Sequence, residues 1–245
     1  MPPRIQPEDD SSEYSADSPV VVVVDPYSTG CLVVHEIISR GFNVIALWTA
    51  EFADEMKGYV PKSCGPIHYV AEVTEGASLE DTANICRKAA DGADIAAVIV
   101  GGEAGVEYAD ALSEHMGLRT NGTKIANRRD KAVQQELVKR AGLRSIREAC
   151  GRKIEDVEDF LKSESYPLVL KPTESAGSDG VKLCQSYEEA VEHFHHLMSM
   201  QLVNGGSCPA VLCQEFLRGK EYIVDTVSCD GVHKVMVSYR EGHLA

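Results

Sequence analysis

The sequence predicts an open, mostly parallel α/β sheet domain followed by a mixed α+β domain. In the first half, short runs of β-branched residues alternate with amphipathic segments of helical period, as in a series of β-α-β units. In the second half, short apolar runs follow one another across turns that contain glycine, which is typical of antiparallel pairs. The change falls near residue 125.

The first half contains continuous apolar runs, the pattern of strands that are buried on both faces of a parallel sheet. We expect strands at Val20–Val24, Asn43–Trp48 and Ile95–Val100, with a shorter candidate at Ile67–Val70. Helices are expected at Cys31–Arg40, Ser78–Ala90 and about 104–116. Ser78 is the expected N-cap of the second helix, because Asp81 follows three residues later.

The second half begins after a turn at Asn121-Gly122. Its expected helices are 128–141, Glu155–Ser163 and Tyr187–Met200. Its expected strands are Pro167–Lys171, Val181–Cys184, Ala210–Phe216, Glu221–Ser228 and Lys234–Tyr239. Asp230-Gly231 predicts a hairpin turn between the last two strands.

The formal net charge of −14 argues against a nucleic-acid partner and against an anionic membrane surface. A solvated acidic exterior is the interpretation we favour. The longest apolar run, Val20–Val24, is far too short to span a bilayer. If such an acidic protein binds an anion, cations must gather locally, so single lysines in special positions are the candidates.

The eight cysteines form no CxxC and no zinc-like set with histidine, so a reduced, cytoplasmic protein is expected. The histidines, including His193, His195 and His196, are expected on helix surfaces. Residues 1–18 are acidic and rich in proline and serine, which predicts a disordered tail rather than a secretory or mitochondrial leader.

Lys171 ends an expected strand and precedes the small-residue loop Thr173–Gly180. Such a loop leaves backbone N–H groups free to approach an anion, and a lysine at its root adds a full positive charge. The combination predicts a phosphate clamp, although it is not a Walker loop. Taken alone, the loop is better explained as a flexible glycine hairpin with a solvated lysine; the elements that follow shift the interpretation toward the clamp.

A second candidate binding segment runs from Val211 to Ser228. Strand alternation places Glu221 and Asp225 on one face with two apolar residues. This pattern indicates either a polar ligand on that face or an edge strand whose acids face solvent.

Together, Lys171-Pro, the loop Ser175–Gly180, and Gln214-Glu-Phe-Leu followed by Gly219-Lys-Glu221 resemble the nucleotide site of ATP-grasp enzymes. These ligases join a carboxylate to an amine or thiol, and the L-amino-acid ligase branch, which makes dipeptides, is the most similar. The resemblance covers roughly residues 20–240. It extends to Val100–Gly122 and to Arg129–Leu137, which carries Lys131.

The resemblance implies a division into domains. Residues 19–125 would form a preATP-grasp α/β domain, and residues 126–245 an ATP-grasp domain. Within the latter, a small lid subdomain would cover about 145–208, and 209–245 would be an incomplete large subdomain.

The resemblance also implies the roles of individual residues. Lys131 and Lys171 would contact the α- and β-phosphates of ATP, and Glu221 would accept hydrogen bonds from the ribose hydroxyls. Gln214 would meet the adenine amino group. The remaining expected contacts are a lid loop over the phosphates and backbone groups along the adenine edge: Ser175, Ala176, Gly177, Ser178 and Gly180 for the loop, and Glu215, Phe216 and Leu217 for the edge.

The implied activity is ATP-dependent ligation through an acyl-phosphate, with Mg²⁺ bridging the phosphates. In the family, the magnesium ligands and catalytic residues lie beyond the position of Glu221, and they have no counterpart in this sequence. We therefore assign no metal ligand and no catalytic residue, and expect the chain alone to bind ATP weakly and to be inactive. The expected partners are ATP and a small carboxylate or amino-acid substrate, and a homodimer is compatible with the sequence.

Two alternatives remain open. A nucleotide-binding module with a regulatory or vestigial role would carry the same ATP elements without performing chemistry. A dinucleotide oxidoreductase would explain the first-half β-α-β series, but Asp25-Pro-Tyr-Ser-Thr-Gly30 stands where GxGxxG is required. Substrate identity is also open, because the loop Asp25–Gly30 and Glu103 could line a cleft or merely form turns.

Overall fold

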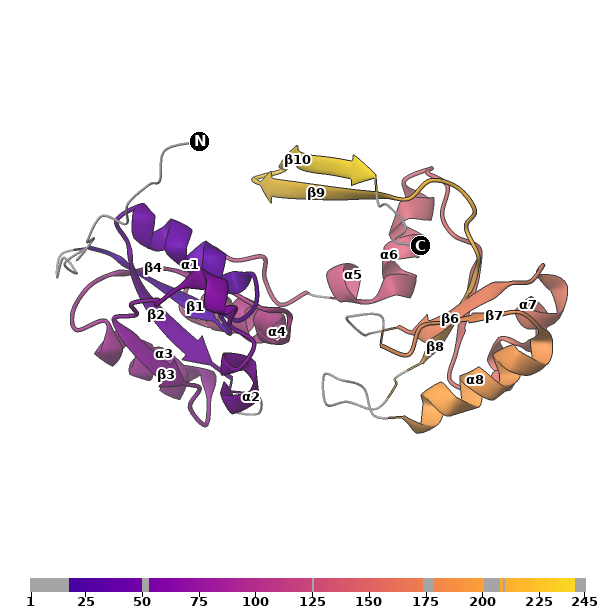
Figure 1. Ribbon diagram of the computed structural model, residues 1–245, viewed down its shortest axis with the longest axis horizontal. Coiled ribbons are helices and arrows are strands. Elements are labelled where there is room, and N and C mark those ends of the chain that lie inside the picture. The colour runs from indigo at the N-terminus through magenta and orange to yellow at the C-terminus, as the bar shows by residue number, and fades with distance from the viewer. Residues whose placement is uncertain are drawn as a thin grey trace, which may run out of the picture. The chain divides into compact units, whose positions relative to one another are not determined.

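The computed structural model describes residues 18–49, 53–124, 126–173, 179–200, 208 and 210–240. It divides into two compact units, Met1–Ala126 and Asn127–Ala245 (Figure 1). No helix in the described part of the chain is long and apolar enough to cross a membrane.

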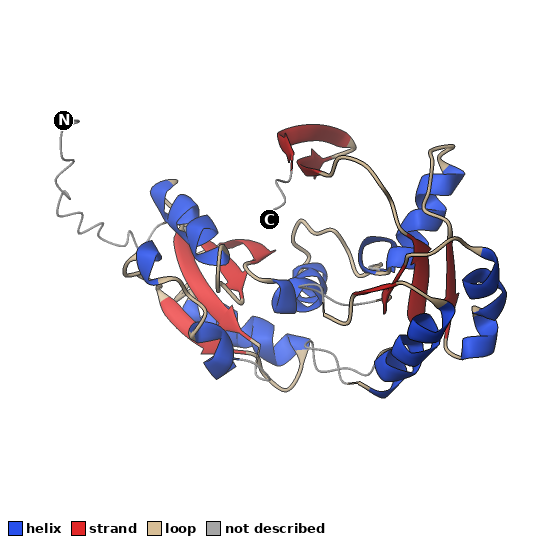
Figure 2. Ribbon diagram, turned by 45° about the vertical axis from the view of Figure 1, so that its right-hand side comes forward, coloured by secondary structure: helices blue, strands red, loops and turns tan. Residues whose placement is uncertain are grey.

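The first unit is a four-stranded parallel sheet in the order β3-β2-β1-β4, with helices on both faces (Figure 2). Three of its strands coincide with those expected from the sequence. The strands are β1 (Val20–Val24), β2 (Asn43–Trp48), β3 (Ala71–Thr74) and β4 (Ile95–Val100). The helices are α1 (Gly30–Ser39), α2 (Ala53–Lys57), α3 (Leu79–Ala89) and α4 (Val106–His115), with short 3₁₀ turns η1 (Lys62–Cys64) and η2 (Glu103–Gly105).

The central strand β1 supplies side chains to two separate apolar cores. Val20, Val22 and Val24 pack into a cluster that includes Ala83 and Leu112 of α3 and α4. Val21 and Val23 pack on the other face with Val34 of α1. Because strand side chains alternate, a run of five valines buries both faces at once, as the sequence predicted.

The third expected strand was wrong in position. The strand β3 begins after Ile67–Val70, while Ile67 and Tyr69 pack against the core from a loop. As the edge of the sheet, β3 is half exposed, so its residues alternate instead of forming a continuous apolar run. The predicted N-cap is confirmed: Ser78 Oγ accepts a hydrogen bond of 3.1 Å from Asp81 N.

The loops that follow β1 and β4 touch through their backbones at the carboxyl edge of the sheet. A Cβ added at Gly30 would lie 2.2 Å from the carbonyl oxygen of Gly101. One added at Gly102 would meet the ring of Tyr27. Glycine is therefore required sterically at the point where α1 begins.

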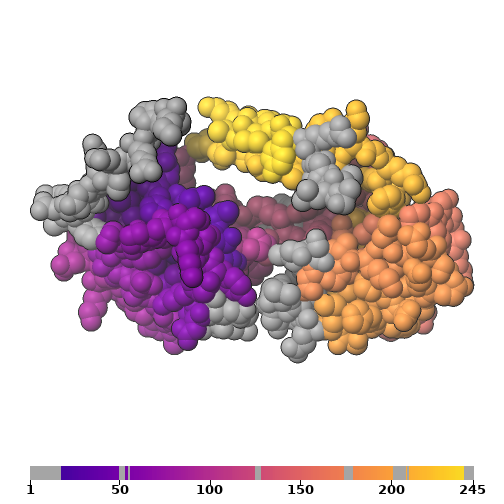
Figure 3. Space-filling model, viewed as in Figure 1, coloured from indigo at the N-terminus to yellow at the C-terminus, as the bar shows by residue number. Residues whose placement is uncertain are grey.

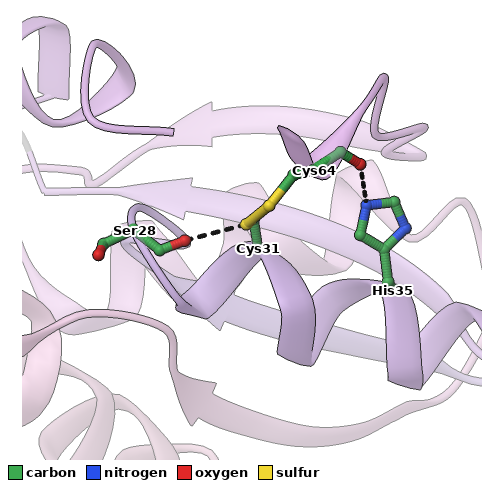
Figure 4. Close-up of a disulfide and its surroundings, with 4 residues drawn as sticks. All are labelled: Ser28, Cys31, His35 and Cys64. Carbon is green, nitrogen blue, oxygen red and sulfur yellow. Dashed lines mark hydrogen bonds between the residues drawn. A yellow bond between two sulfur atoms is a disulfide. The ribbon is translucent and has the colours of Figure 1, made fainter. Parts of the chain in front are cut away.

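The expectation that all cysteines are reduced was wrong, because a disulfide joins Cys31 to Cys64 (Figure 4). It connects the first turn of α1 to η1, and His35 Nε2 donates to the Cys64 carbonyl oxygen at 2.8 Å. The remaining six cysteines are free. The two partners are 33 residues apart in the sequence, so no local motif could indicate this pairing.

The second unit contains an antiparallel sheet in the order β5-β8-β6-β7. Its strands are β5 (Glu148–Gly151), β6 (Leu168–Pro172), β7 (Lys182–Cys184) and β8 (Val211–Glu215). Its helices are α5 (Ala126–Arg129), α6 (Lys131–Arg140), α7 (Glu158–Ser163) and α8 (Tyr187–Ser199), with the 3₁₀ turn η3 (Ile154–Asp156). The strand β5 was not predicted from the sequence, and the single helix expected at 128–141 is two helices, α5 and α6, separated at Asp130.

One face of this second sheet packs against α7 and α8. Leu168, Leu170 and Cys213 meet Leu161 and Phe194 in a single buried cluster. The other face of the sheet carries Glu148, Gln214 and Lys171 beside apolar residues such as Leu212.

His193 is buried on α8, which corrects the expectation that the histidines of this helix lie on its surface. Its Nε2 donates a hydrogen bond of 2.9 Å to the carbonyl oxygen of Gly180. Burial, the largest cause, lowers the pKa of His193, and nearby Lys182 lowers it further. The helix thus holds the end of the glycine-rich loop through an imidazole that favours its neutral form.

The last two strands, β9 (Tyr222–Cys229) and β10 (Val232–Arg240), form a separate two-stranded sheet. Asp230 and Gly231 both have positive φ (50° and 76°), so the predicted Asp-Gly hairpin turn is confirmed. Nearly all described side chains of the hairpin, including Val227 and Val235, are exposed (Figure 3).

A Gly30→Ala substitution should destabilise the protein by about 1–3 kcal/mol, because the added methyl group has no room beside the Gly101 carbonyl. Denaturant unfolding measures this change. Leu32→Ala on the same helix is the control, since Leu32 is 59% exposed, and it should change the free energy of unfolding by at most about 0.5 kcal/mol. If Gly30→Ala and Leu32→Ala changed the free energy of unfolding equally, the close approach of the Gly30 and Gly101 backbones would be contradicted.

His193 should make folding stability fall as the pH falls. The pKa of His193 is lower in the folded chain than in the unfolded chain. The stability that the neutral imidazole contributes is therefore fully present above the unfolded pKa, and it is lost as the pH falls below that value. Below pH about 6.5, the wild type should lose stability more steeply than His193→Gln, by at most about 1.4 kcal/mol per pH unit. Thermal unfolding between neutral and mildly acidic pH measures this, with the exposed His195→Gln as control. Parallel curves for wild type and His193→Gln would exclude the effect.

Candidate functional site

The face of the second sheet that points away from α7 and α8 carries two rows of paired residues. Glu148, Gln214 and Val169 are opposite one another on β5, β8 and β6. Cys150, Leu212 and Lys171 form the next row. Because directly paired residues of antiparallel strands share a face, this register brings a carboxylate, an amide and an ammonium group to neighbouring positions.

Lys131 is brought to the same region by the start of α6. Asp130 caps this helix, with its Oδ1 accepting from Val133 N at 2.9 Å. Lys131 Nζ then donates to the carbonyl oxygen of Thr173 at 3.2 Å, directly after β6. The root of the glycine-rich loop and the first turn of α6 are therefore held together.

Lys131 is close enough to Lys171 to affect the pKa of the Lys171 ammonium group. Burial, the largest cause, lowers the pKa of Lys171, and the positive charge of Lys131 lowers it further, while Glu148 raises it. Two half-buried cations from separate segments thus share one region of an acidic protein. Mutual repulsion of this kind is relieved by an anion, which is the behaviour expected of a phosphate site.

Gln214 is almost fully buried, at 3% exposure, and its Nε2 donates to Glu148 Oε2 at 2.6 Å. Burial is the main cause that raises the pKa of Glu148, whereas the Gln214 hydrogen bond and Lys171 lower it. Glu148 was not among the site residues predicted from the sequence. The only local signal would have been β5, a four-residue strand with no apolar run to reveal it.

Glu215 has a structural contact that the sequence did not predict. Arg144 Nη2 lies 2.7 Å and Arg147 Nη1 lies 2.8 Å from its carboxylate oxygens. Glu215 N also donates to the Arg147 carbonyl oxygen at 3.0 Å. These bonds fix the end of β8, after which Phe216 and Leu217 are exposed at 41% and 50%.

The other predicted site residues are distributed as follows. Ser175, Ala176, Gly177 and Ser178 lie outside the described residues. Gly180, with φ of +71°, packs against Leu197 and is held by His193. Glu221 is exposed immediately before β9, and it makes no hydrogen bond or ion pair with the described residues. The structure thus brings Lys131, Lys171 and Gln214 into one region and does not join Glu221 to them.

The donor set suits a nucleotide better than a metal ion. Two cations and a buried amide can bind phosphates and a polar base edge. In contrast, the described residues contain no group of three or more His, Cys, Asp or Glu side chains placed to hold a metal. No step of a reaction is therefore assigned to a metal ligand of this chain.

Residues 129–243 match the model of the ATP-grasp (A) domain of phosphoribosylglycinamide synthetase. The chain is 34% identical over 140 residues to dapdiamide A synthase of Enterobacter agglomerans, a match that covers 56% of this chain and 33% of that protein. The chain thus spans about a third of the length of this curated relative.

Two solved structures share the fold. The L-amino acid ligase from Bacillus licheniformis superposes with a TM-score of 0.69 and 16% identity, over 92% of this chain and 53% of that one. The biotin carboxylase domain dimer of 2-oxoglutarate carboxylase from Hydrogenobacter thermophilus, solved with MgADP, ADP and bicarbonate, gives a TM-score of 0.57 and 18% identity, over 82% and 45% of the two chains.

These likenesses in fold cover both units of the structure, the open parallel sheet and the α+β unit that follows it. The match of residues 129–243 falls on the unit that brings Lys131, Lys171 and Gln214 together. Residues 129–243 are therefore similar to an ATP-grasp domain, and the chain as a whole shares its fold with proteins that include an L-amino acid ligase.

Proposed function

We propose that this chain is the ATP-binding portion of a ligase that joins a carboxylate to an amine at the expense of ATP. The observation that carries the proposal is the meeting of Lys131 and Lys171, from α6 and β6, on the sheet face that also holds the buried Gln214. The relative dapdiamide A synthase and the neighbouring L-amino acid ligase support this reaction class.

In the proposed complex, Lys131 and Lys171 neutralise the α- and β-phosphates, and the loop Ser175–Gly180 closes over them. Gln214 accepts a hydrogen bond from the adenine amino group. Backbone groups of Glu215–Leu217 bind the ring edge, and Glu221 binds the ribose hydroxyls after a movement that brings the start of β9 to the sugar. The Arg144 and Arg147 contacts hold Glu215 in place for this role.

The proposed reaction has two steps. A substrate carboxylate oxygen takes the γ-phosphoryl group of ATP and forms an acyl-phosphate, with ADP leaving. An amine then attacks the acyl carbon, and phosphate leaves as the C–N bond forms. Mg²⁺ would supply further charge neutralisation between the phosphates. The contribution of the described residues is to position the nucleotide and to offset its negative charge.

We also propose the domain roles implied by this assignment. Residues 19–125 act as the preATP-grasp domain, about 145–208 as the lid subdomain, and 209–245 as part of the large subdomain. Because a structural neighbour is a domain dimer, we include a homodimer among the proposed assemblies. The substrates proposed are a small carboxylate and an amino acid.

A non-catalytic nucleotide-binding module is the second candidate. It is favoured by the lack of a metal-binding group among the described side chains. Phosphate release from ATP in the presence of amino-acid mixtures separates the candidates. We expect the chain as given to bind ATP weakly and to release no phosphate in response to amino acids; robust release would show that the chain carries its own catalytic end.

Lys171→Ala should weaken ATP binding by about 1–3 kcal/mol, roughly 5- to 150-fold, because it removes a charge-assisted hydrogen bond to a phosphate. Lys131→Ala should have an effect of the same size. Calorimetric titration with ATP measures both. Lys139→Ala, on the exposed side of the same helix as Lys131, is the matched control and should leave the affinity unchanged.

An ATP affinity that is the same in wild type, Lys131→Ala and Lys171→Ala would remove both lysines from the site. Preferential binding of NADH over ATP in the same titration would instead favour a dinucleotide-binding function.

A further inference from the structure

The Gln214 side chain is buried and bonded at one end only. Its Nε2 donates to Glu148 Oε2 at 2.6 Å, and the side chain is 3% exposed. Its Oε1 accepts no hydrogen bond from the described residues, yet it is not among the fully enclosed polar atoms that lack a partner. The amide oxygen is therefore the end of Gln214 that is available to a ligand.

An amide can be turned over, which exchanges its donor and acceptor ends. An ionised carboxylate only accepts hydrogen bonds, so Glu148 admits only the orientation in which Nε2 faces it. The turned-over amide would bring two oxygens without a proton to about 2.6 Å, the distance that the two groups now share. Glu148 thus sets the polarity of the Gln214 amide.

The backbone holds these two residues opposite each other. Glu148 and Gln214 are directly paired in the β5–β8 register, so neither can move away without breaking strand pairing. Burial raises the pKa of Glu148, but the hydrogen bond from Gln214 and the charge of Lys171, one row along on the same face, oppose this and favour the ionised form. The geometry therefore keeps a charged acceptor against the amide nitrogen.

We propose that Glu148 is a positioning residue that fixes Gln214 Oε1 as a hydrogen-bond acceptor, and that the site thereby selects a purine with an amino group at position 6. The inference rests on the proposed nucleotide site. Glu148 was not predicted from the sequence, and its hydrogen bond to Gln214 gives a physical reason for selecting the base. A 6-amino group donates to Oε1, whereas a 6-oxo group places a second acceptor against it.

Comparison of ATP with inosine triphosphate tests this proposal, because the two nucleotides differ only at the 6-position and the adjacent N1 proton. The readout is the ratio of their dissociation constants, which cancels any effect on phosphate binding or on overall stability. In the wild type, inosine triphosphate should bind about 10- to 100-fold more weakly than ATP, the usual cost of a buried polar group left without its partner.

Glu148→Gln allows both orientations of Gln214, since either amide can then donate to the other. The ratio should fall by about tenfold. Glu155→Gln, an exposed site in the same unit, removes the same charge and should leave the ratio unchanged. The double variant Glu148→Gln with Gln214→Glu should restore the ratio, because the carboxylate at position 214 can only accept.

A single variant that keeps the wild-type ratio, or a double variant that fails to restore it, overturns the inference while leaving ATP binding intact. Wild-type chain that binds neither nucleotide overturns the proposed function itself, and the inference with it. If Glu148→Gln does not fold by thermal unfolding, Glu148→Met replaces it; this variant also frees the amide to turn and should give the same fall in the ratio.

Discussion

The antiparallel register of β5, β8 and β6 is the constraint on which the candidate site depends. Pairing decides which side chains share a face, and a shift of one residue would exchange the two faces. In the observed register, Leu170 and Cys213 enter the helix-covered core, while Lys171 and Gln214 point the other way. Core packing and site construction are therefore specified by the same strand alternation, so apolar burial in the core also holds the polar residues in place.

The two lysines of the candidate site act against the overall negative charge of the chain. The chain carries a net charge of −14, and this general field repels an anion. Lys131 and Lys171 oppose it locally, and burial makes each charge more effective than it would be in water. Glu148 interacts with both the Gln214 amide and the Lys171 ammonium group, so it offsets part of the cost of burying Lys171 while remaining bonded to Gln214.

The sequence predicted a good part of this arrangement. The continuous valine run of β1 and the Asp-Gly turn of the last hairpin were found because each has a local cause, burial on both faces in one case and positive φ in the other. The resemblance to ATP-grasp enzymes picked out Lys131, Lys171 and Gln214. The roles assigned to these residues remain proposals.

Other features were not accessible from the sequence, because they arise between distant segments. The Cys31–Cys64 disulfide and the Gln214–Glu148 hydrogen bond span 33 and 66 residues. His193 was assigned to a helix surface because nothing in its neighbourhood reveals that the Gly180 carbonyl lies beside it. Edge strands such as β3 and β5 were misplaced or missed, because half-exposed or very short strands lack the apolar run that marks a central one.

The guanidinium group of Arg147 binds two carboxylates that belong to different layers of the second unit. One is Glu215, the last residue of β8, and the other is Glu164, immediately after α7, at 2.9 Å. A single planar cation thus fastens the end of a sheet strand to the end of a helix. A displacement of α7 would therefore strain or break one of the two ion pairs of Arg147, so the position of this helix and the end of β8 are linked through one side chain.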